Sequence, residues 1–410
     1  MIPHSLAATD IDVQPTIDAP LSRGRMQLWV ERSALPADDL LTFAERHNPK
    51  RAFLFVSKIL GRHIPADPML HTQMAAALAR DVVPHCRHGD VAVMGFAETA
   101  VGLGAGVHEA LATSLGGRVL PYMPSTRHPG NAQVWFGFSE SHSHATDHHV
   151  LEACDEGHRR ALRNATTLVV VDDEATTGAT FAGLVTAALT AGMDALEQVV
   201  LVSYTDWSQG QAERTIQQAT GGRVAVASVA LATGRWNWRA DPTADALPPT
   251  PMPPRALDVE DVGHDGPTWR QGIPAHLPEW DVARILGQTP VMDGTGVLAI
   301  GTGEYVWEAT RFARAVARTG LEARFLATTR SPILPGGAIA SKVSFPDHYG
   351  LGIWMHLHNA RTRTWRHTVV FTEREDARGI APALAHHLGT FSLVTPSGRV
   401  LPVFQGQLPT

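Results

Sequence analysis

Apolar and polar positions along the chain follow the pattern of buried strands that alternate with helices. Short apolar runs at Asp90–Gly95, Leu168–Asp173 and Val199–Tyr204 end in glycine or polar residues, which is typical of buried strands. Between the last two runs, apolar residues recur at helical spacing, namely at Phe181, Leu184, Val185, Ala188 and Leu189. Strands rich in valine and separated by helices predict an α/β fold, a doubly wound parallel sheet with helices on both faces.

The N-terminal part has a mixed pattern. MQLWVE from Met26 onward is typical of a strand, and Asp38 to Arg46 has the spacing of a short amphipathic helix. The stretch before it is polar and carries prolines, so we expect an N-terminal arm over residues 1–22.

A proline-dense stretch divides the chain. It contains DPTADALPPTPMPPR, which can continue neither a helix nor a sheet, and it predicts a semi-rigid linker. After it, VLAIG, a helical stretch from Tyr305 to Thr319 and ARFLATT repeat the α/β pattern. We therefore expect a first domain over residues 23–239, a linker over 240–284 and a second, smaller α/β domain over 285–410.

Composition narrows the class of protein. The chain of 410 residues is 44% hydrophobic and 18% charged, with a formal net charge of −6. A net negative charge disfavours a general nucleic-acid interface, which needs a basic face. The two cysteines, Cys86 and Cys154, are too few for a disulfide framework. No apolar run reaches the roughly 18 residues of a membrane span. We expect a cytoplasmic enzyme with neither a nucleic acid nor a membrane as its partner.

The residues with the clearest chemistry are VVVDDEATTGAT, Val169–Thr180. A buried strand brings Asp172 and Asp173 to its carboxyl end, where ligands of open α/β sheets bind. A Thr/Gly turn and a helix N-terminus follow, and these suit a phosphate group. Two carboxylates would repel an anion unless they bind a cation or ribose hydroxyls. A ribose phosphate with Mg²⁺ meets both demands. The alternative is a well-capped helix with no ligand.

This segment resembles the phosphate loop of the type I phosphoribosyltransferases, which use 5-phosphoribosyl-1-pyrophosphate (PRPP). The resemblance implies that Asp172 and Asp173 face the ribose hydroxyls, and contact Mg²⁺ only indirectly through PRPP. The role of Glu174, where many members carry a smaller residue, stays open. The residues that would hold the 5′-phosphate are Ala175, Thr176, Thr177, Gly178, Ala179 and Thr180.

An earlier strand, loop and helix, DVAVMGFAETAVGLG, agrees with this resemblance. In the same class of enzymes the equivalent loop holds pyrophosphate with backbone N–H groups. These groups would belong to Phe96, Ala97, Glu98 and Thr99. By charge, Glu98 is a poor pyrophosphate ligand, and we consider contacts to Mg²⁺, to the acceptor or to Arg127 instead.

Between the two loops, PSTRHPG and FGFSESHSHATDHHV occupy the place of the mobile hood that closes over PRPP in type I enzymes. A departing pyrophosphate needs cations and proton donors. We expect Arg127, His142 and His144 to supply them, together with His128. The alternatives are a metal site of His142, His144, His148 and His149, or, for the last two, solvated loop histidines.

Two further stretches allow both a functional and a structural interpretation. Lys58 and Arg62 lie in NPKRAFLFVSKILGRHIP and could bind phosphate or the acceptor, or could equally be surface cations on a sheet edge. The tryptophans of GRWNWR could stack on a planar acceptor, although packing is the commoner role.

Several motifs occur twice in the same order. Gly95-x-x-Glu98 recurs as Gly301-x-x-Glu304, and Ser125–Pro129 (STRHP) recurs as Thr328–Pro332 (TTRSP). Asp147-His148 recurs as Asp347-His348, and an acidic strand end, Asp173 or Glu373, follows 26 residues after each aspartate. This order indicates an internal duplication, with chance similarity as the alternative. The second copy has TEREDARG in place of DDEATTGAT, so we expect a degenerate copy there.

Together these motifs resemble a bacterial family that joins an orotate-phosphoribosyltransferase-like domain to a C-terminal domain named for its Thr-Arg-Ser-Pro motif. The family is associated with tellurium-resistance gene clusters and is thought to help make a nucleoside-like metabolite. The resemblance implies an Mg²⁺-dependent transfer of ribose 5-phosphate from PRPP to a small, base-like acceptor, with release of pyrophosphate. A homodimer is expected by analogy. A non-catalytic PRPP or nucleotide sensor and a nucleoside-phosphate hydrolase or phosphorylase remain alternatives.

Overall fold

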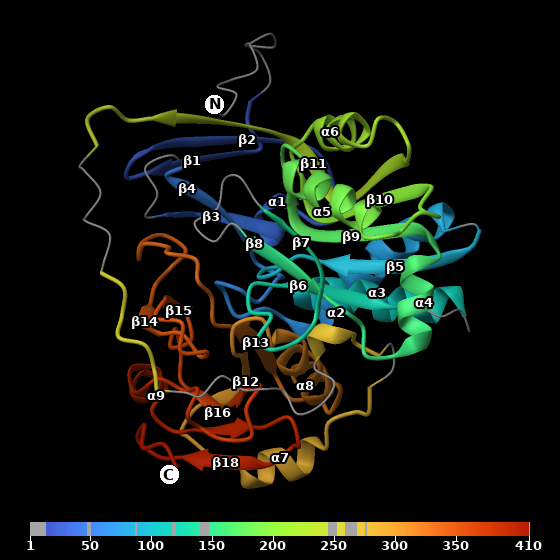
Figure 1. Ribbon diagram of the computed structural model, residues 1–410. Coiled ribbons are helices and arrows are strands. Elements are labelled where there is room, and N and C mark those ends of the chain that lie inside the picture. Colours follow the sequence, from blue (N-terminus) through green and yellow to red (C-terminus); the bar gives the residue numbers. More distant parts are fainter. Residues whose placement is uncertain are drawn as a thin grey trace.

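The computed structural model describes residues 14–46, 51–86, 88–116, 120–139, 147–244, 252–258, 269–274 and 277–409. Within these residues the chain forms a nine-stranded sheet and a five-stranded sheet, with two small hairpins. Figure 1 shows the larger sheet in blue to green above the smaller one in orange to red. The two domains therefore follow each other along the chain.

The centre of the larger sheet is parallel and buried on both faces. Along the strand that ends in the acid pair, Leu168 and Val170 enter one hydrophobic core, and Val169 and Val171 enter the other. This explains the uninterrupted apolar run and confirms the predicted doubly wound α/β fold. In sheet order the strands are β1 (Ile17–Leu21), β2 (Gly24–Ser33), β11 (Ala225–Ala240), β10 (Gln198–Asp206), β9 (Ala165–Ala175), β5 (Asp90–Gly95), β6 (Tyr122–Thr126), β8 (Asp147–Leu151) and β7 (Val134–Ser139).

Helices cover both faces of this sheet. One face carries α2 (Pro68–Val82) and α3 (Val101–Leu115), and the other carries α4 (Glu156–Arg163), α5 (Ala179–Thr190) and α6 (Gln211–Ala219). α2 begins where Asp67 accepts hydrogen bonds from the amides of Met69 and Leu70 at 2.8 and 3.3 Å, a standard N-cap. Among the described residues, no helix is both long and apolar enough to cross a membrane.

The N-terminal segment corrects two sequence predictions. Residues 17–21, inside the expected arm, form β1, which pairs with β2. The helix expected over 38–46 is limited to α1 (Ala37–Leu40), because the following residues form β3 (Leu41–Glu45), paired with β4 (Phe53–Ser57). Leu41 and Phe43 lie on one face of this hairpin and pack into an aromatic cluster, which outweighs the helical spacing.

The second domain is a smaller α/β unit. One face of its sheet carries α7 (Val282–Gln288) and α8 (Val306–Arg318), and the other carries α9 (Pro382–Leu388) and the hairpin of β14 (Lys342–Pro346) and β15 (Trp354–His358). In sheet order the strands are β13 (Ala323–Ala327), β12 (Thr295–Gly301), β16 (Trp365–Phe371), β17 (Phe391–Val394) and β18 (Val400–Val403).

The two domains share one topology. The order β6-β5-β9-β10 of the first sheet corresponds to β13-β12-β16-β17 of the second. Along the chain, an antiparallel hairpin follows β6 in the first domain and β13 in the second. This agrees with the predicted internal duplication.

The start of the second unit differs from the prediction. The 3-10 turn η2 (Trp269–Gln271) and the first residues of α7 lie inside the expected linker, and Arg270 is only 2% exposed. The sequence RHIPA from Arg62 recurs as RQGIPA from Arg270. We propose that the duplicated unit begins near Trp269 and that only the preceding stretch connects the domains.

The interface between the domains is a continuous hydrophobic core. Ala66, Ala97 and Val101 of the first domain share one core with α8 and the second sheet. Gly102 packs so closely that a Cβ atom there would lie 3.0 Å from Val306 Cγ1. Figure 1 shows α2 and α3 above α8, across this boundary.

Four histidines are buried at or near this interface. His63, His71, His356 and His358 are at most 6% exposed. Burial lowers the pKa of His71 to about 4 and of His356 and His358 to about 3, and it lowers that of His63 well below its ordinary value. All four are therefore neutral in the folded chain at neutral pH.

Mild acid should destabilise the fold. In the unfolded chain these histidines take up protons below pH ~6.5, whereas the folded chain binds them only at lower pH, so stability present above pH ~6.5 is lost as the pH falls. Between pH 7 and pH 5 we expect each to cost at most roughly 2 kcal/mol. Urea unfolding at pH 7.5 and pH 5.0 measures this. The exposed His386, changed to Gln, should leave the pH dependence unaltered, and equal stability at both pH values would contradict the prediction.

Candidate functional site

The acid pair lies at the carboxyl edge of the larger sheet. Asp172 and Asp173 follow the buried Val171 in β9, next to the ends of β5 and β10, and both are half-buried. The amide of Asp173 donates a hydrogen bond to Asp172 Oδ1 at 2.9 Å. This bond fixes the first carboxylate relative to the backbone of the second.

The turn after β9 leads directly into α5. Gly178 has φ +78°, and a Cβ atom there would lie 2.4 Å from Ala212 Cα, so only glycine fits this position. Thr215 Oγ1 of α6 donates to the carbonyl of Thr177 at 2.8 Å and holds the turn. As in any α-helix, the first N–H groups of α5 have no carbonyl acceptor within the helix. A helix N-terminus of this kind can bind an anion.

The loop after β5 contacts the acid pair. Thr99 Oγ1 donates to Asp173 Oδ1 at 2.9 Å, so the two loops predicted from separate motifs form one site. The amides of Phe96 and Ala97 are engaged internally, with Val171 O at 3.0 Å and Ser125 Oγ at 2.9 Å. The expectation that both amides bind pyrophosphate is therefore wrong, and Glu98 and Thr99 are the remaining amide donors of this loop.

Arg62 does not lie where it could bind phosphate as predicted. It is 2% exposed and donates to the carbonyl oxygens of Gly303 at 3.0 Å, Thr328 at 2.8 Å and Glu98. Burial lowers its pKa, and the charges of Glu98 and Asp173 oppose this effect. Arg62 thus ties the first domain to the second beneath the acid pair.

Lys58 has a local role in this structure. Its ammonium group donates to the carbonyl of Asp38, beside α1. Neither cation from this segment is placed as predicted for binding phosphate.

Glu174 joins the site to an aromatic cluster. Arg51 donates to Glu174 Oε1 at 2.9 Å, and its guanidinium lies 5.0 Å from the ring centroid of Phe53. Burial raises the pKa of Glu174, and the charge of Arg51 opposes this. Phe55 stacks on Trp207 with 5.5 Å between ring centroids, and the amide of Trp207 bonds to Ala175 O. This cluster therefore adjoins the phosphate loop.

The tryptophans of GRWNWR pack in the same cluster. Trp236 and Trp238 each lie 5.1 Å from Phe53 between ring centroids. The packing interpretation holds for these residues.

A second polar centre lies on the other side of the interface. Glu304 accepts hydrogen bonds from the amide of Arg127 at 2.8 Å and from Thr126 Oγ1 at 2.6 Å. Its pKa would rise on burial, but Arg270 and His128 bring it below its ordinary value. Arg127, predicted for the PRPP site, is therefore anchored against the second domain.

Arg270 is the centre of this second cluster. Its guanidinium pairs with Glu304 at 3.3 Å and with Glu373, to which it donates two hydrogen bonds. Tyr349 donates to Glu373 at 2.6 Å, and the ring of His128 lies 4.3 Å from that of Tyr349. Glu373, the counterpart of Asp173, is thus occupied by an internal cation.

The predicted hood histidines are only partly described. His142 and His144 lie outside the described residues. His148 is buried in β8, where it stacks on Phe138 and contacts Ser125 Oγ at 3.0 Å, so it is not a solvated loop residue. Within the described ranges, no group of three or more His, Cys, Asp or Glu side chains is arranged to hold a metal ion.

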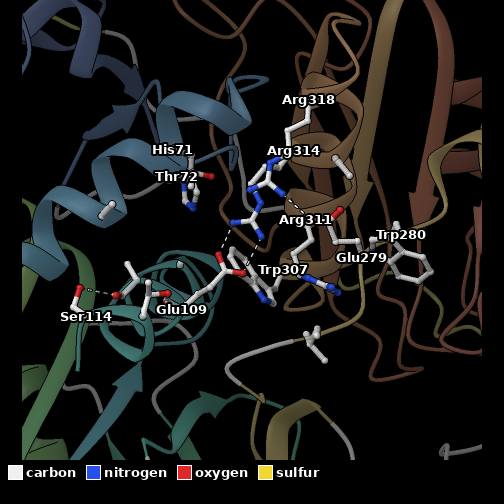
Figure 2. Close-up of a pocket in the computed structure, with 16 residues that line it drawn as sticks. His71, Thr72, Glu109, Ser114, Glu279, Trp280, Trp307, Arg311, Arg314 and Arg318 are labelled. Atoms are coloured by element: carbon white, nitrogen blue, oxygen red, sulfur yellow. Dashed lines mark hydrogen bonds and ion pairs between the residues drawn. The ribbon is translucent and has the colours of Figure 1, made fainter. Parts of the chain in front are cut away.

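A cavity of about 510 Å³ lies away from the acid pair, between α2, α3 and α8. Figure 2 shows Arg311, Arg314 and Arg318 of α8 in it, together with Glu109 and Glu279. The pairs are Arg311 with Glu308, Arg314 with Glu109 and Arg318 with Glu279. Because these charges are compensated, the cavity is a poor binding site for an anion.

Sequence reasoning missed the partners across the interface. Arg270 was assigned to a linker, and Tyr349 was not singled out. The recurrence of Arg-x-(x)-Ile-Pro-Ala at residues 62 and 270 is the signal that could have found Arg270.

Family models match both domains. Residues 40–235 match a family described as phosphoribosyl transferase, and residues 277–388 match a TRSP domain that lies C-terminal to it. The chain carries a phosphoribosyl transferase domain followed by a TRSP domain. The chain is therefore an enzyme of the transferase class, as predicted. No curated protein matches it by sequence.

Solved phosphoribosyltransferases are similar to part of the chain. The adenine enzyme of Giardia lamblia with 9-deazaadenine is 15% identical, with 48% of this chain and 95% of that chain covered and a TM-score of 0.32. The adenine enzyme of Trypanosoma brucei with AMP, pyrophosphate and ribose-5-phosphate is 14% identical, with 47% of this chain and 76% of that chain covered and a TM-score of 0.33. The orotate enzyme of Mycobacterium tuberculosis with PRPP is 17% identical, with 40% of this chain and 76% of that chain covered and a TM-score of 0.22. Similarity at these TM-scores carries no argument about the site.

Proposed function

We propose that the chain transfers ribose 5-phosphate from PRPP to a small, base-like acceptor and releases pyrophosphate. The observation that carries the proposal is the hydrogen bond from Thr99 to Asp173. It brings the loop after β5 against the acid pair of β9, so that groups suited to pyrophosphate, ribose and phosphate lie along one sheet edge.

Each part of PRPP has a proposed partner. Asp172 and Asp173 accept hydrogen bonds from the ribose hydroxyls. Residues 175–180 hold the 5′-phosphate through the N-terminus of α5 and the threonine hydroxyls. The amides of Glu98 and Thr99 face the pyrophosphate, whose stabilisation as it leaves is the main catalytic task.

Mg²⁺ fits this site as an ion that arrives with the substrate. It commonly keeps several waters and binds one or two carboxylates together with substrate phosphates. The chain offers the paired carboxylates of Asp172 and Asp173 at the edge of the sheet, without a protein cage in the described residues. When bound, Mg²⁺ supplies positive charge to the pyrophosphate. The acid pair orients the ribose and, through it, the metal-bound substrate.

The acceptor side is proposed to lie toward Glu174. The pair of Glu174 and Arg51 offers a hydrogen-bond acceptor and a donor beside the stacked rings of Phe55 and Trp207. A planar heterocycle with polar edges suits such surroundings. The product would then be a nucleotide, consistent with the synthesis of a nucleoside-like metabolite.

The test is release of pyrophosphate from PRPP and Mg²⁺ by the full chain with a panel of nitrogen heterocycles. Acceptor-dependent release supports the transferase. Release without an acceptor indicates a hydrolase, and PRPP binding with no release under any condition indicates a sensor. Either of these two results would overturn the proposed reaction.

A further inference from the structure

The two domains exchange equivalent contacts across their interface. The amide of Arg330, in the TRSP motif, donates to both carboxylate oxygens of Glu98 at 3.0 and 3.3 Å. Reciprocally, the amide of Arg127, in the STRHP motif, donates to Glu304 at 2.8 Å. These contacts are reciprocal, because each copy makes the same kind of contact to the other copy. Reciprocal contacts are typical of a two-fold dimer interface.

Other contacts join corresponding segments of the two domains, although not strictly corresponding residues. Arg62 donates to Thr328 O at 2.8 Å, and its counterpart Arg270 donates to Thr126 Oγ1 at 3.1 Å. The amide of Ala66 bonds to Phe325 O at 2.9 Å, and the amide of Ile273 bonds to Tyr122 O at 3.2 Å. The second domain therefore occupies the place that a second subunit has in a dimer.

The two half-sites have diverged in chemistry. The first keeps the acid pair and the Thr/Gly turn. In the second, Glu373 is hydrogen-bonded to Arg270 and Tyr349, and the residues after it lack the Thr-Thr-Gly turn of the phosphate loop. Only the first half-site can hold PRPP in the proposed way, and one arginine that contacts its pyrophosphate loop, Arg330, comes from the second domain.

We propose that Arg330 of the TRSP motif binds the pyrophosphate group of PRPP in the site of the first domain. This inference rests on the proposed function. Its basis is the position of the Arg330 backbone against Glu98, the residue whose amide faces the pyrophosphate. The second domain thereby completes the donor site as a built-in second subunit.

The guanidinium of Arg330 is available for this role. It is half-buried, and none of the described residues forms a hydrogen bond or an ion pair with it. Two described cations of the first domain near the site are engaged, Arg51 with Glu174 and Arg62 with backbone carbonyls. Four carboxylates surround the site, at Glu98, Asp172, Asp173 and Glu174. A pyrophosphate group there needs positive charge in addition to that of Mg²⁺, and arginine suits phosphate oxygens.

The experiment is calorimetric titration of PRPP with Mg²⁺, and separately of ribose 5-phosphate, into the full chain and its variants. Arg330→Ala should weaken PRPP binding roughly tenfold or more, as expected for a lost charge-assisted hydrogen bond. Ribose 5-phosphate, which has no pyrophosphate, should bind Arg330→Ala and the unaltered chain equally. Arg330→Lys should restore part of the PRPP affinity. Arg366→Ala removes an exposed arginine of the same domain and serves as the matched control.

The melting temperature of the unliganded chain separates binding from folding. It should not change in Arg330→Ala, because the guanidinium forms no hydrogen bond or ion pair with the described residues. Equal PRPP affinity in Arg330→Ala and Arg366→Ala, or equal weakening for PRPP and ribose 5-phosphate, would overturn the inference while leaving the proposed function intact. Absence of PRPP binding by the unaltered chain would remove both.

Discussion

A chain with both Asp172→Asn and Asp173→Asn is expected to lose PRPP binding and turnover by at least ~100-fold. Each carboxylate accepts charge-assisted hydrogen bonds in the proposed complex, and each such bond contributes roughly 1.5–3 kcal/mol. The change keeps the size of both side chains, and the amide oxygen that replaces the Asp173 carboxylate can still accept the hydrogen bond from Thr99. Calorimetry and pyrophosphate release measure the two effects.

Asp194→Asn is the matched control for this double variant. The Asp194 side chain is 82% exposed in the same domain, so the same chemical change there should leave PRPP affinity unaltered. A double variant that binds PRPP as well as this control would contradict the assignment of the acid pair.

Removing Arg270 is expected to cost about 3–5 kcal/mol of the free energy of unfolding, the usual cost of leaving a buried charge without its partner. Arg270 is 2% exposed, and its partners Glu304 and Glu373 are 2% and 7% exposed. Arg270→Met keeps much of the volume of the side chain but leaves both carboxylates uncompensated. Urea unfolding, compared with the unaltered chain, measures the loss.

The exposed pair of Arg318 and Glu279 is the control for this variant. Their side chains are 50% and 71% exposed, so Arg318→Ala should cost at most about 1 kcal/mol. Adding Glu373→Gln to Arg270→Met should recover part of the lost stability, because one buried charge is then removed. Equal stability of Arg270→Met and Arg318→Ala would contradict a structural role for the cluster.

The local structure around the acid pair could be predicted from the sequence. A buried strand followed by Asp172, Asp173 and a Thr/Gly turn has few structural solutions, because the strand must end at the sheet edge and the glycine must adopt positive φ. The duplicated motifs likewise predicted that the second α/β unit is a copy of the first.

The rest depended on tertiary contacts that no local pattern encodes. No local pattern predicts that the charged residues Arg62 and Arg270 are buried, because only the packing of the two domains covers them. The start of the second unit that we propose at η2 was not predicted, because the proline-rich composition of this part of the chain indicates a linker. Residues 41–45 became a strand because β4 pairs with them and the aromatic cluster covers their apolar side.

Calorimetric titration of PRPP into the full chain, with and without Mg²⁺, is the most direct test of PRPP binding at Asp172 and Asp173. We expect Mg²⁺-dependent binding that is absent from the Asp172→Asn/Asp173→Asn chain. No binding under either condition, or binding that persists in this double variant, would contradict it.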